Sequence, residues 1–171
     1  MFLQWSFHIR DIGVDGLETL TYSEAQLQDQ IYSLKQRYQA NEVFYLATCN
    51  RVEFLLYSQK SFTSTLPDFT QLKPQVKTNL KDITNYWLSV CCSLDSIVFG
   101  ENQIIGQVKK AFSNLQKKQL LGAEISKFMH LIFRESKWIR NNSSLARIQT
   151  SVSAVVAKRI QSLFKNEGSV L

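Results

Sequence analysis

The sequence predicts an α+β fold, in which a small antiparallel sheet precedes a group of helices. The first half of the chain holds short runs of apolar, aromatic and β-branched residues, which favour strands. From Asp82 onward the apolar residues instead recur at helical spacing. Only the five residues TCNRV separate two of the early runs, so those two strands are expected to pair antiparallel through a tight turn.

Three strands are predicted over residues 2–9, 43–47 and 53–57, because each of these short runs is dominated by apolar and aromatic side chains. A helix is expected between the first two strands, since Ser23 and Gln26 have the spacing of a capping box. The apolar residues of that helix recur on one face, at Leu27, Ile31, Leu34 and Tyr38.

The second half of the chain is predicted to be helical, after a loop with one edge strand over residues 58–81. Four helices are expected: over about 82–93, from near Glu101 to a stop at Gly122, from Ala123 onward, and from Thr150 or Ser151. The second of these helices is predicted to bury Ile104, Ile105, Val108, Ala111, Phe112 and Leu115. The third is predicted to bury Ile125, Phe128, Met129, Ile132 and Ile139.

The composition fits a folded domain, because 44% of the 171 residues are apolar and 12% are aromatic. Twenty Lys and Arg against fourteen Asp and Glu give a net charge of +6, which would attract a polyanion such as RNA. The same basic residues also fit a solvated helix face, so charge alone identifies no partner. No apolar run reaches the length of a membrane span and the N-terminus lacks a basic leader, so we expect a cytoplasmic protein.

The three cysteines predict free thiols, because an odd number without paired metal-ligand spacing suggests neither a disulfide framework nor a zinc site. Cys91 and Cys92 lie among apolar residues and are expected to belong to the core. His130, next to Met129 on a predicted helix, is expected to have a structural or surface role.

Cys49 has different surroundings, since it lies between a threonine and an asparagine in the segment ATCNRVEF, residues 47–54. A free cysteine most often behaves as a small buried hydrophobe. A tight turn and the nearby guanidinium of Arg51 would instead favour the thiolate, which is the nucleophilic form. Both a core role and a catalytic role fit this segment alone.

A second polar segment, LDSIVFGENQIIGQVK over residues 94–109, surrounds a glycine turn and a predicted helix start. Its polar side chains between apolar residues fit a partly buried hydrogen-bonding site: Asp95, Ser96, Glu101, Asn102, Gln103 and Gln107. The alternative makes Glu101 a first-turn carboxylate that the helix dipole favours, with the other residues on an exposed helix surface.

Together these segments resemble the glutamyl-tRNA reductases. LATCNRVEF is similar to the motif around the active-site cysteine of that family, and SLDSIVFGENQIIGQVKKAF is similar to its second signature, which usually has proline where Asn102 stands. The likeness extends more weakly over residues 123–140 and 150–166. It implies a ferredoxin-like sheet with one or two helices, then a helical subdomain, in a catalytic domain over 1–149. Residues 150–171 would begin the long spinal helix of the family.

The resemblance implies a reaction as well as a fold. These enzymes attack the ester of glutamyl-tRNA with a cysteine and reduce the resulting thioester with NADPH to glutamate 1-semialdehyde, toward 5-aminolevulinate and the tetrapyrroles (porphyrins). Carried over by position, Cys49 would be the nucleophile. The substrate-binding residues would be Thr48, Arg51, Ser96, Glu101, Gln103 and Gln107.

Further domains are expected outside this chain, because it contains no glycine-rich dinucleotide motif. The resemblance implies an NADPH-binding domain and a C-terminal domain through which two copies form a homodimer. It implies no metal. Glutamyl-tRNA is the expected partner, with glutamate-1-semialdehyde aminomutase as a further one.

The chain also departs from the family pattern, and this keeps alternatives open. Tyr86 stands where the family usually has a histidine, and a tyrosine with an ordinary pKa near 10 is a poor base that can still donate a hydrogen bond. His8 and Arg10 do not fit the family's N-terminal spacing without a shift, and residues 58–81 are few for a strand and a helix. The alternatives are a non-catalytic tRNA-binding or regulatory module and a helical interaction module.

Overall fold

A computed structural model describes residues 1–62, 64–68, 70–94 and 103–142 of the chain. They form a four-stranded antiparallel sheet in the order β2-β3-β1-β4. The strands are β1 (Phe2–His8), β2 (Glu42–Ala47), β3 (Arg51–Tyr57) and β4 (Gln75–Lys77). The helices are α1 (Ile9–Thr19), α2 (Glu24–Tyr38), α3 (Leu80–Cys91), α4 (Gln103–Lys117) and α5 (Ala123–Asn142).

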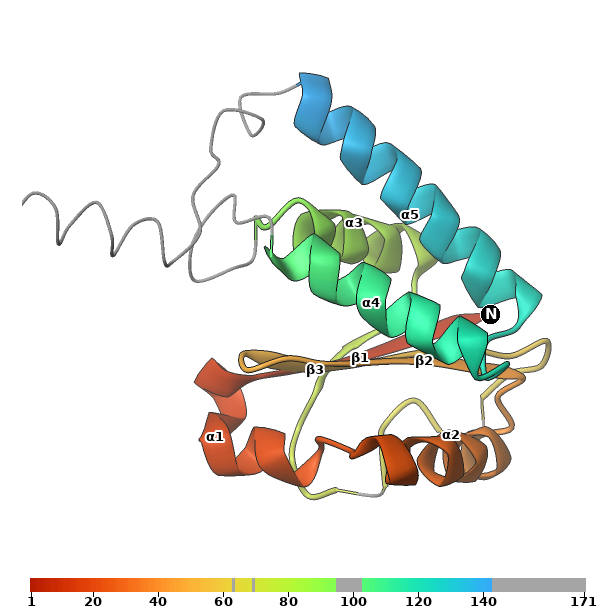
Figure 1. The fold of residues 1–171 in the computed structure, drawn as a ribbon. Coiled ribbons are helices and arrows are strands. Elements are labelled where there is room, and N and C mark those ends of the chain that lie inside the picture. Colours follow the sequence, from red (N-terminus) through yellow and green to blue (C-terminus); the bar gives the residue numbers. More distant parts are fainter. Residues whose placement is uncertain (63, 69, 95–102, 143–171) are drawn as a thin grey trace, which may run out of the picture.

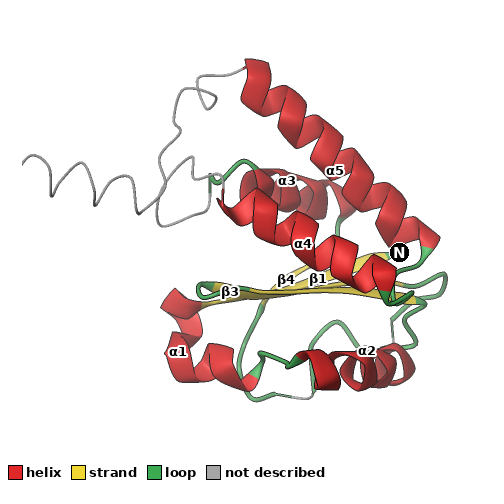
Figure 2. Cartoon of the chain, in the orientation of Figure 1, coloured by secondary structure: helices red, strands yellow, loops and turns green. Residues whose placement is uncertain are grey.

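The sheet lies between two helical layers. Figure 1 shows α1 and α2 on one face and α3, α4 and α5 on the other, and Figure 2 shows how the sheet separates them. The predicted α+β class is therefore confirmed, and the strand order is that of a ferredoxin-like sheet. The edge strand predicted within 58–81 is β4, and the described residues between β3 and β4 form no helix. Within the described ranges, none of the helices combines the length and apolarity needed to cross a bilayer.

The two faces of the sheet differ in chemistry. Successive side chains of a strand point to opposite faces, so β1 sends Trp5 towards Tyr38 of α2, with their ring centroids 4.7 Å apart. The alternate position Gln4 accepts a hydrogen bond from the indole of Trp87 on α3, at 2.9 Å. Both strand residues are fully buried. The face towards α2 is thus largely apolar, and the face towards α3 carries a strip of polar side chains.

The helix between the first two strands was predicted correctly in α2, but a second helix, α1, was missed. Ser23 caps α2. Its hydroxyl accepts a hydrogen bond from the Gln26 backbone amide, and the Gln26 side-chain oxygen accepts one from the Ser23 backbone amide. The sequence of α1 gives no clear helical pattern, because Gly13 interrupts the helix with a φ of 71°, outside the helical region. A kinked helix with glycines shows no clear 3.6-residue period.

The end of α4 also differs from the prediction. The helix ends at Lys117 and Gln119 takes the left-handed conformation with a φ of 56°, so Gly122 does not stop it. Gly122 instead lies against Glu42 at the start of β2, where an added Cβ would be 2.2 Å from the carboxyl carbon. The buried faces of α4 and α5 agree with the prediction, except that Ile105, Ala111 and Ile139 are only partly buried. The helix expected from Thr150 or Ser151 and the domain boundary at 149 lie outside the described residues.

Glu42 connects the sheet to the start of α5. Its carboxylate oxygens accept hydrogen bonds from the backbone amides of Glu124, at 3.0 Å, and Ile125, at 2.7 Å. Glu42 is buried, and the first amides of a helix otherwise have no partner. The carboxylate therefore caps α5 and fixes it on the edge strand β2.

Replacing Glu42 by alanine should lower the free energy of unfolding by about 2 kcal/mol, because two buried amides lose their acceptor. Urea denaturation measures this change, with Glu18→Ala on the exposed side of α1 as the matched loss of a carboxylate. Equal effects of the two substitutions would contradict the capping role of Glu42.

Candidate active site at the β2–β3 hairpin

The turn that joins β2 to β3 presents Cys49 at its tip. The Thr48 amide donates to the Arg51 carbonyl at 2.9 Å, which leaves Cys49 and Asn50 as a two-residue loop. The Thr48 hydroxyl accepts hydrogen bonds from the amides of Asn50, at 3.3 Å, and Arg51, at 3.2 Å. Thr48 thus shapes the turn that carries the cysteine, and its hydroxyl is already engaged there.

The tip of the hairpin is also tied to the neighbouring strand. The first amide of α1, from Ile9, donates to the Asn50 carbonyl at 3.0 Å. This bond continues the β1–β3 pairing, whose last pair is His8 and Arg51. The turn is therefore held by hydrogen bonds on both sides, and the backbone carbonyl of Asn50 takes part in one of them.

Cys49 is the exposed one of the three cysteines. Cys91 and Cys92 are buried, as predicted for core thiols, and burial raises the pKa of Cys91 to about 12 and also raises that of Cys92. A thiol with a raised pKa is protonated and unreactive at neutral pH. Of the three cysteines, Cys49 is therefore the one whose thiol a reagent or substrate can reach.

Arg51 lies beneath the hairpin tip in a cluster of buried polar side chains. Its Nη1 is 3.7 Å from a carboxylate oxygen of Glu53 and 3.4 Å from the Tyr86 hydroxyl, and these side chains are almost wholly buried. The Tyr86 hydroxyl donates to Glu53 and lies 3.3 Å from Nε2 of His8. We call these four residues, His8, Arg51, Glu53 and Tyr86, the buried polar cluster.

The cluster continues away from the hairpin through Glu53. The side-chain amide of Gln4 donates to the second Glu53 oxygen at 2.7 Å, and the ammonium of Lys77 lies 4.3 Å from the centre of the Tyr86 ring. Burial raises the pKa of Glu53 to about 7, although Arg51 and the Tyr86 hydroxyl lower it. Burial and the Glu53 charge raise the pKa of Tyr86. Tyr86 is therefore a hydrogen-bond donor at neutral pH.

Two members of this cluster, Glu53 and His8, were not predicted as site residues. The signal for Glu53 was present, because a residue two positions after Arg51 on a strand points to the same face. The sequence prediction counted it within an apolar run. His8 could not be assigned to a face without the register of β1, and that register pairs it with Arg51.

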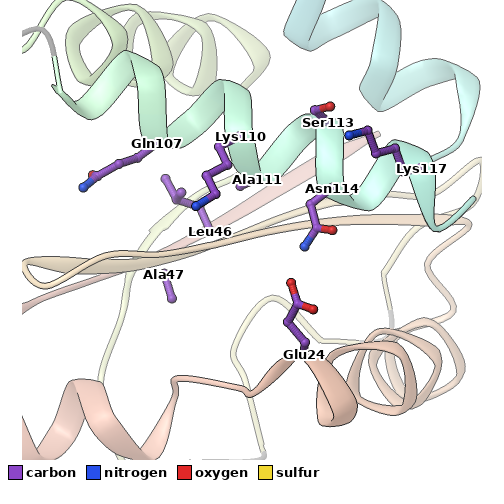
Figure 3. Close-up of a pocket in the computed structure, with 9 residues that line it drawn as sticks. All are labelled: Glu24, Leu46, Ala47, Gln107, Lys110, Ala111, Ser113, Asn114 and Lys117. Atoms are coloured by element: carbon purple, nitrogen blue, oxygen red, sulfur yellow. The ribbon is translucent and has the colours of Figure 1, made fainter.

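The second polar segment is only partly described. Ser96 and Glu101, both predicted to bind substrate, lie outside the described residues. Gln103 and Gln107 are exposed on α4, one turn apart. Gln107 lines a cavity of about 550 Å³ between α4 and β2, together with Ala47, which lies two residues before Cys49 (Figure 3). The fold thus brings Gln107 to the end of β2 that carries the hairpin.

Tyr86 also borders a second cavity, of about 510 Å³, on the β4 side of α3. Arg10 and Lys77 line it with Asp82 and Asn85. A residue of the buried polar cluster is therefore reached from an open space that has basic side chains in its wall. In the described part of the chain, no three His, Cys, Asp or Glu side chains gather as a metal site requires.

Comparison with known proteins places this hairpin in a family. A family model described as "Glutamyl-tRNAGlu reductase, N-terminal domain" matches residues 6–143, which is most of the chain and includes the whole site. The chain belongs to this family. The resemblance found in the two sequence motifs is thereby confirmed.

Individual relatives agree with the family assignment. A glutamyl-tRNA reductase of Herpetosiphon aurantiacus is 32% identical over 164 residues, covering 86% of this chain and 38% of that protein. One of Clostridium acetobutylicum is 28% identical over 158 residues, covering 88% and 39%. The chain thus spans about two fifths of the length of these relatives. The solved glutamyl-tRNA reductase from Methanopyrus kandleri shares the fold, with a TM-score of 0.68 at 18% identity over 83% of this chain and 35% of that chain.

A thiol-specific reagent should modify Cys49 of the native domain rapidly and the other two cysteines only on unfolding, because exposure controls access to the sulfur. Mass spectrometry of the labelled chain identifies the modified residue. The Cys49→Ser variant should lose the rapid phase and Cys92→Ser should keep it. Rapid modification of Cys91 or Cys92 in the native protein would contradict the burial described above.

The raised pKa of Glu53 should appear in the pH dependence of stability. A carboxyl whose pKa rises from 4.5 to about 7 on folding stabilises the fold fully below pH 4.5 and loses that contribution as the pH rises through 7. Relative to Glu53→Gln, the native chain should lose at most about 3 kcal/mol over this window. Urea titrations at pH 4.5 and pH 8 measure the difference, and a difference that does not change with pH would refute the assignment.

Proposed function

We propose that this chain is the catalytic domain of a glutamyl-tRNA reductase, and that Cys49 accepts the glutamyl group of glutamyl-tRNA as a thioester. The observation that carries this proposal is an exposed thiol on a fixed hairpin tip, in the segment that the family model covers. Strand β3 adds a buried guanidinium, that of Arg51, two residues after Cys49 in the chain.

The proposed step is an acyl transfer. The Cys49 thiolate attacks the ester carbonyl carbon, a carbon–sulfur bond forms, and the bond between that carbon and the ribose oxygen of the tRNA breaks. The leaving oxygen takes up a proton, which gives free tRNA and a glutamyl thioester on Cys49. Covalent capture turns one difficult reduction into two easier steps.

Recognition of the glutamyl side chain is assigned to Arg51. Its guanidinium can pair with a carboxylate, and in the fold it already faces the carboxyl of Glu53 at 3.7 Å. Because the pKa of Glu53 is about 7, protonation of Glu53 near neutral pH would weaken its attraction for the Arg51 guanidinium. Tyr86, in the position of the family histidine, supplies a hydrogen bond to this pair. Thr48, Ser96, Glu101, Gln103 and Gln107 remain predicted substrate-binding residues.

The reduction itself is not assigned to the described residues. Their antiparallel sheet offers no parallel βαβ unit with a glycine-rich turn, which a dinucleotide such as NADPH would need. We therefore attribute NADPH binding and formation of glutamate 1-semialdehyde to residues beyond the described domain. Dimerisation, contact with glutamate-1-semialdehyde aminomutase and a cytoplasmic location remain part of the proposal.

Thioester formation is tested by incubating the chain with tRNA that carries labelled glutamate, followed by electrophoresis at neutral pH. The native chain and the Cys92→Ser control should retain label, and Cys49→Ser should retain none, since serine lacks the nucleophilic thiolate. Release of the label by neutral hydroxylamine would identify the bond as a thioester.

One observation favours a second function, a non-catalytic tRNA-binding module. The hydroxyl of Tyr86 is engaged by Glu53 and its raised pKa makes it unable to accept a proton at neutral pH, unlike a histidine. Equal, salt-dependent binding of acylated and free tRNA, with no label on a demonstrably folded chain, would favour the module over the enzyme.

A further inference from the structure

The cavity between α4 and the edge strand β2 has the features of a groove for a polyanion (Figure 3). It has a volume of about 550 Å³, and Leu46 and Ala47 form its wall on the sheet side. From α4 it receives Lys110 and Lys117. Because Ala47 directly precedes the turn, the groove begins beside the hairpin that carries Cys49.

The two lysines are arranged along the groove. They are seven residues apart, two turns of one helix face, so their backbone positions are separated by about 10 Å. Both are exposed, and neither makes an ion pair with another described residue. Two ammonium groups at such a separation suit a charge distributed along a chain better than a single small anion.

The remaining lining supports the same interpretation. Glu24 is the acidic residue of the lining, and its carboxylate lies 3.9 Å from the ammonium of Lys118, which offsets its charge. Gln107 and Asn114 add amide groups that can bond to sugar and base edges, while Leu46 and Ala47 offer apolar surface. A groove with basic side chains that follow the phosphate backbone is one of the two features of sites for single-stranded nucleic acid, and this lining offers it without the second, an aromatic stacking surface.

We propose that this groove holds the single-stranded 3′ end of the tRNA substrate, with its backbone phosphates at Lys110 and Lys117. The terminal nucleotide, which bears the aminoacyl ester, then lies at the Ala47 end, next to Cys49. This inference rests on the proposed function, because the direction of the strand follows from the position of the thiol. It adds the surface that aligns the ester with the nucleophile.

Binding of a non-acylated, single-stranded RNA with the 3′-terminal sequence of the tRNA tests the groove. Fluorescence anisotropy over a salt series should show that the double variant Lys110→Gln, Lys117→Gln binds at least about ten-fold more weakly at low salt. The slope of log affinity against log salt should fall by about 1.4, since each lost phosphate contact on a single strand contributes about 0.7. Lys110→Arg, Lys117→Arg should restore both quantities.

A matched control removes two other charges. Lys109 neighbours Lys110 on α4 but lies over the ring of Phe133, 5.8 Å from its centre, and Lys137 is exposed on α5. The variant Lys109→Gln, Lys137→Gln should keep most of the affinity and of the salt slope. Equal losses in the two double variants, or no loss in the groove variant, would overturn the proposal in favour of diffuse attraction by the net charge.

A second measurement separates this inference from the proposed function. The RNA in the binding assay carries no ester. The outcome of that assay therefore does not depend on the reactivity of Cys49. In the labelling assay, the groove variant should label slowly at low glutamyl-tRNA and recover at saturating concentrations. A defect that persists at saturation would contradict a pure binding role. Absence of label in every variant, with groove binding intact, would refute the thioester proposal alone.

Discussion

The pairing of Arg51 with Glu53 is the constraint on which the end of the sheet depends. Both side chains are almost wholly buried, and an unpaired charge there would carry a large desolvation penalty. Tyr86 and Gln4 complete the hydrogen bonding of the carboxylate, so α3 must lie where its tyrosine reaches β3. A buried ion pair adds little net stability compared with an apolar pair, but removing one partner leaves an uncompensated buried charge and is strongly destabilising.

The position of Cys49 is fixed by the hydrogen bonds that constrain the backbone of the turn. Thr48 closes the loop with its own backbone and hydroxyl, and the Asn50 carbonyl holds the first amide of α1. An exposed side chain on so constrained a backbone has access to solvent without the mobility of a long loop. This combination suits a proposed nucleophile, because the backbone that carries the thiol is positioned before a substrate arrives. The buried Cys91 and Cys92 lack the access to solvent.

The sequence was sufficient for features that depend on local patterns. The capping box of α2, the tight β2–β3 turn and the apolar faces of α4 and α5 each follow from spacing, and the structure has all of them. Features that depend on tertiary contacts were missed. Helix α1 has an interrupting glycine at Gly13, and the partner of Gly122 is Glu42, which lies eighty residues earlier in the chain. The face of Glu53 followed from strand alternation, but its hydrogen bond with Tyr86, 33 residues later, could not be predicted from local spacing.

Tyr86 limits the proton chemistry of the buried polar cluster. The phenol donates a hydrogen bond to Glu53 and accepts one from Arg51, and its raised pKa keeps it protonated at neutral pH. The titratable carboxyl near neutral pH is then Glu53 itself, with a pKa of about 7. Because Glu53 faces the guanidinium of Arg51 at 3.7 Å, its protonation changes the net charge of the buried polar cluster. In this chain, therefore, the proton that would tune the proposed site resides on the strand that carries Arg51, two residues from it, and not on α3.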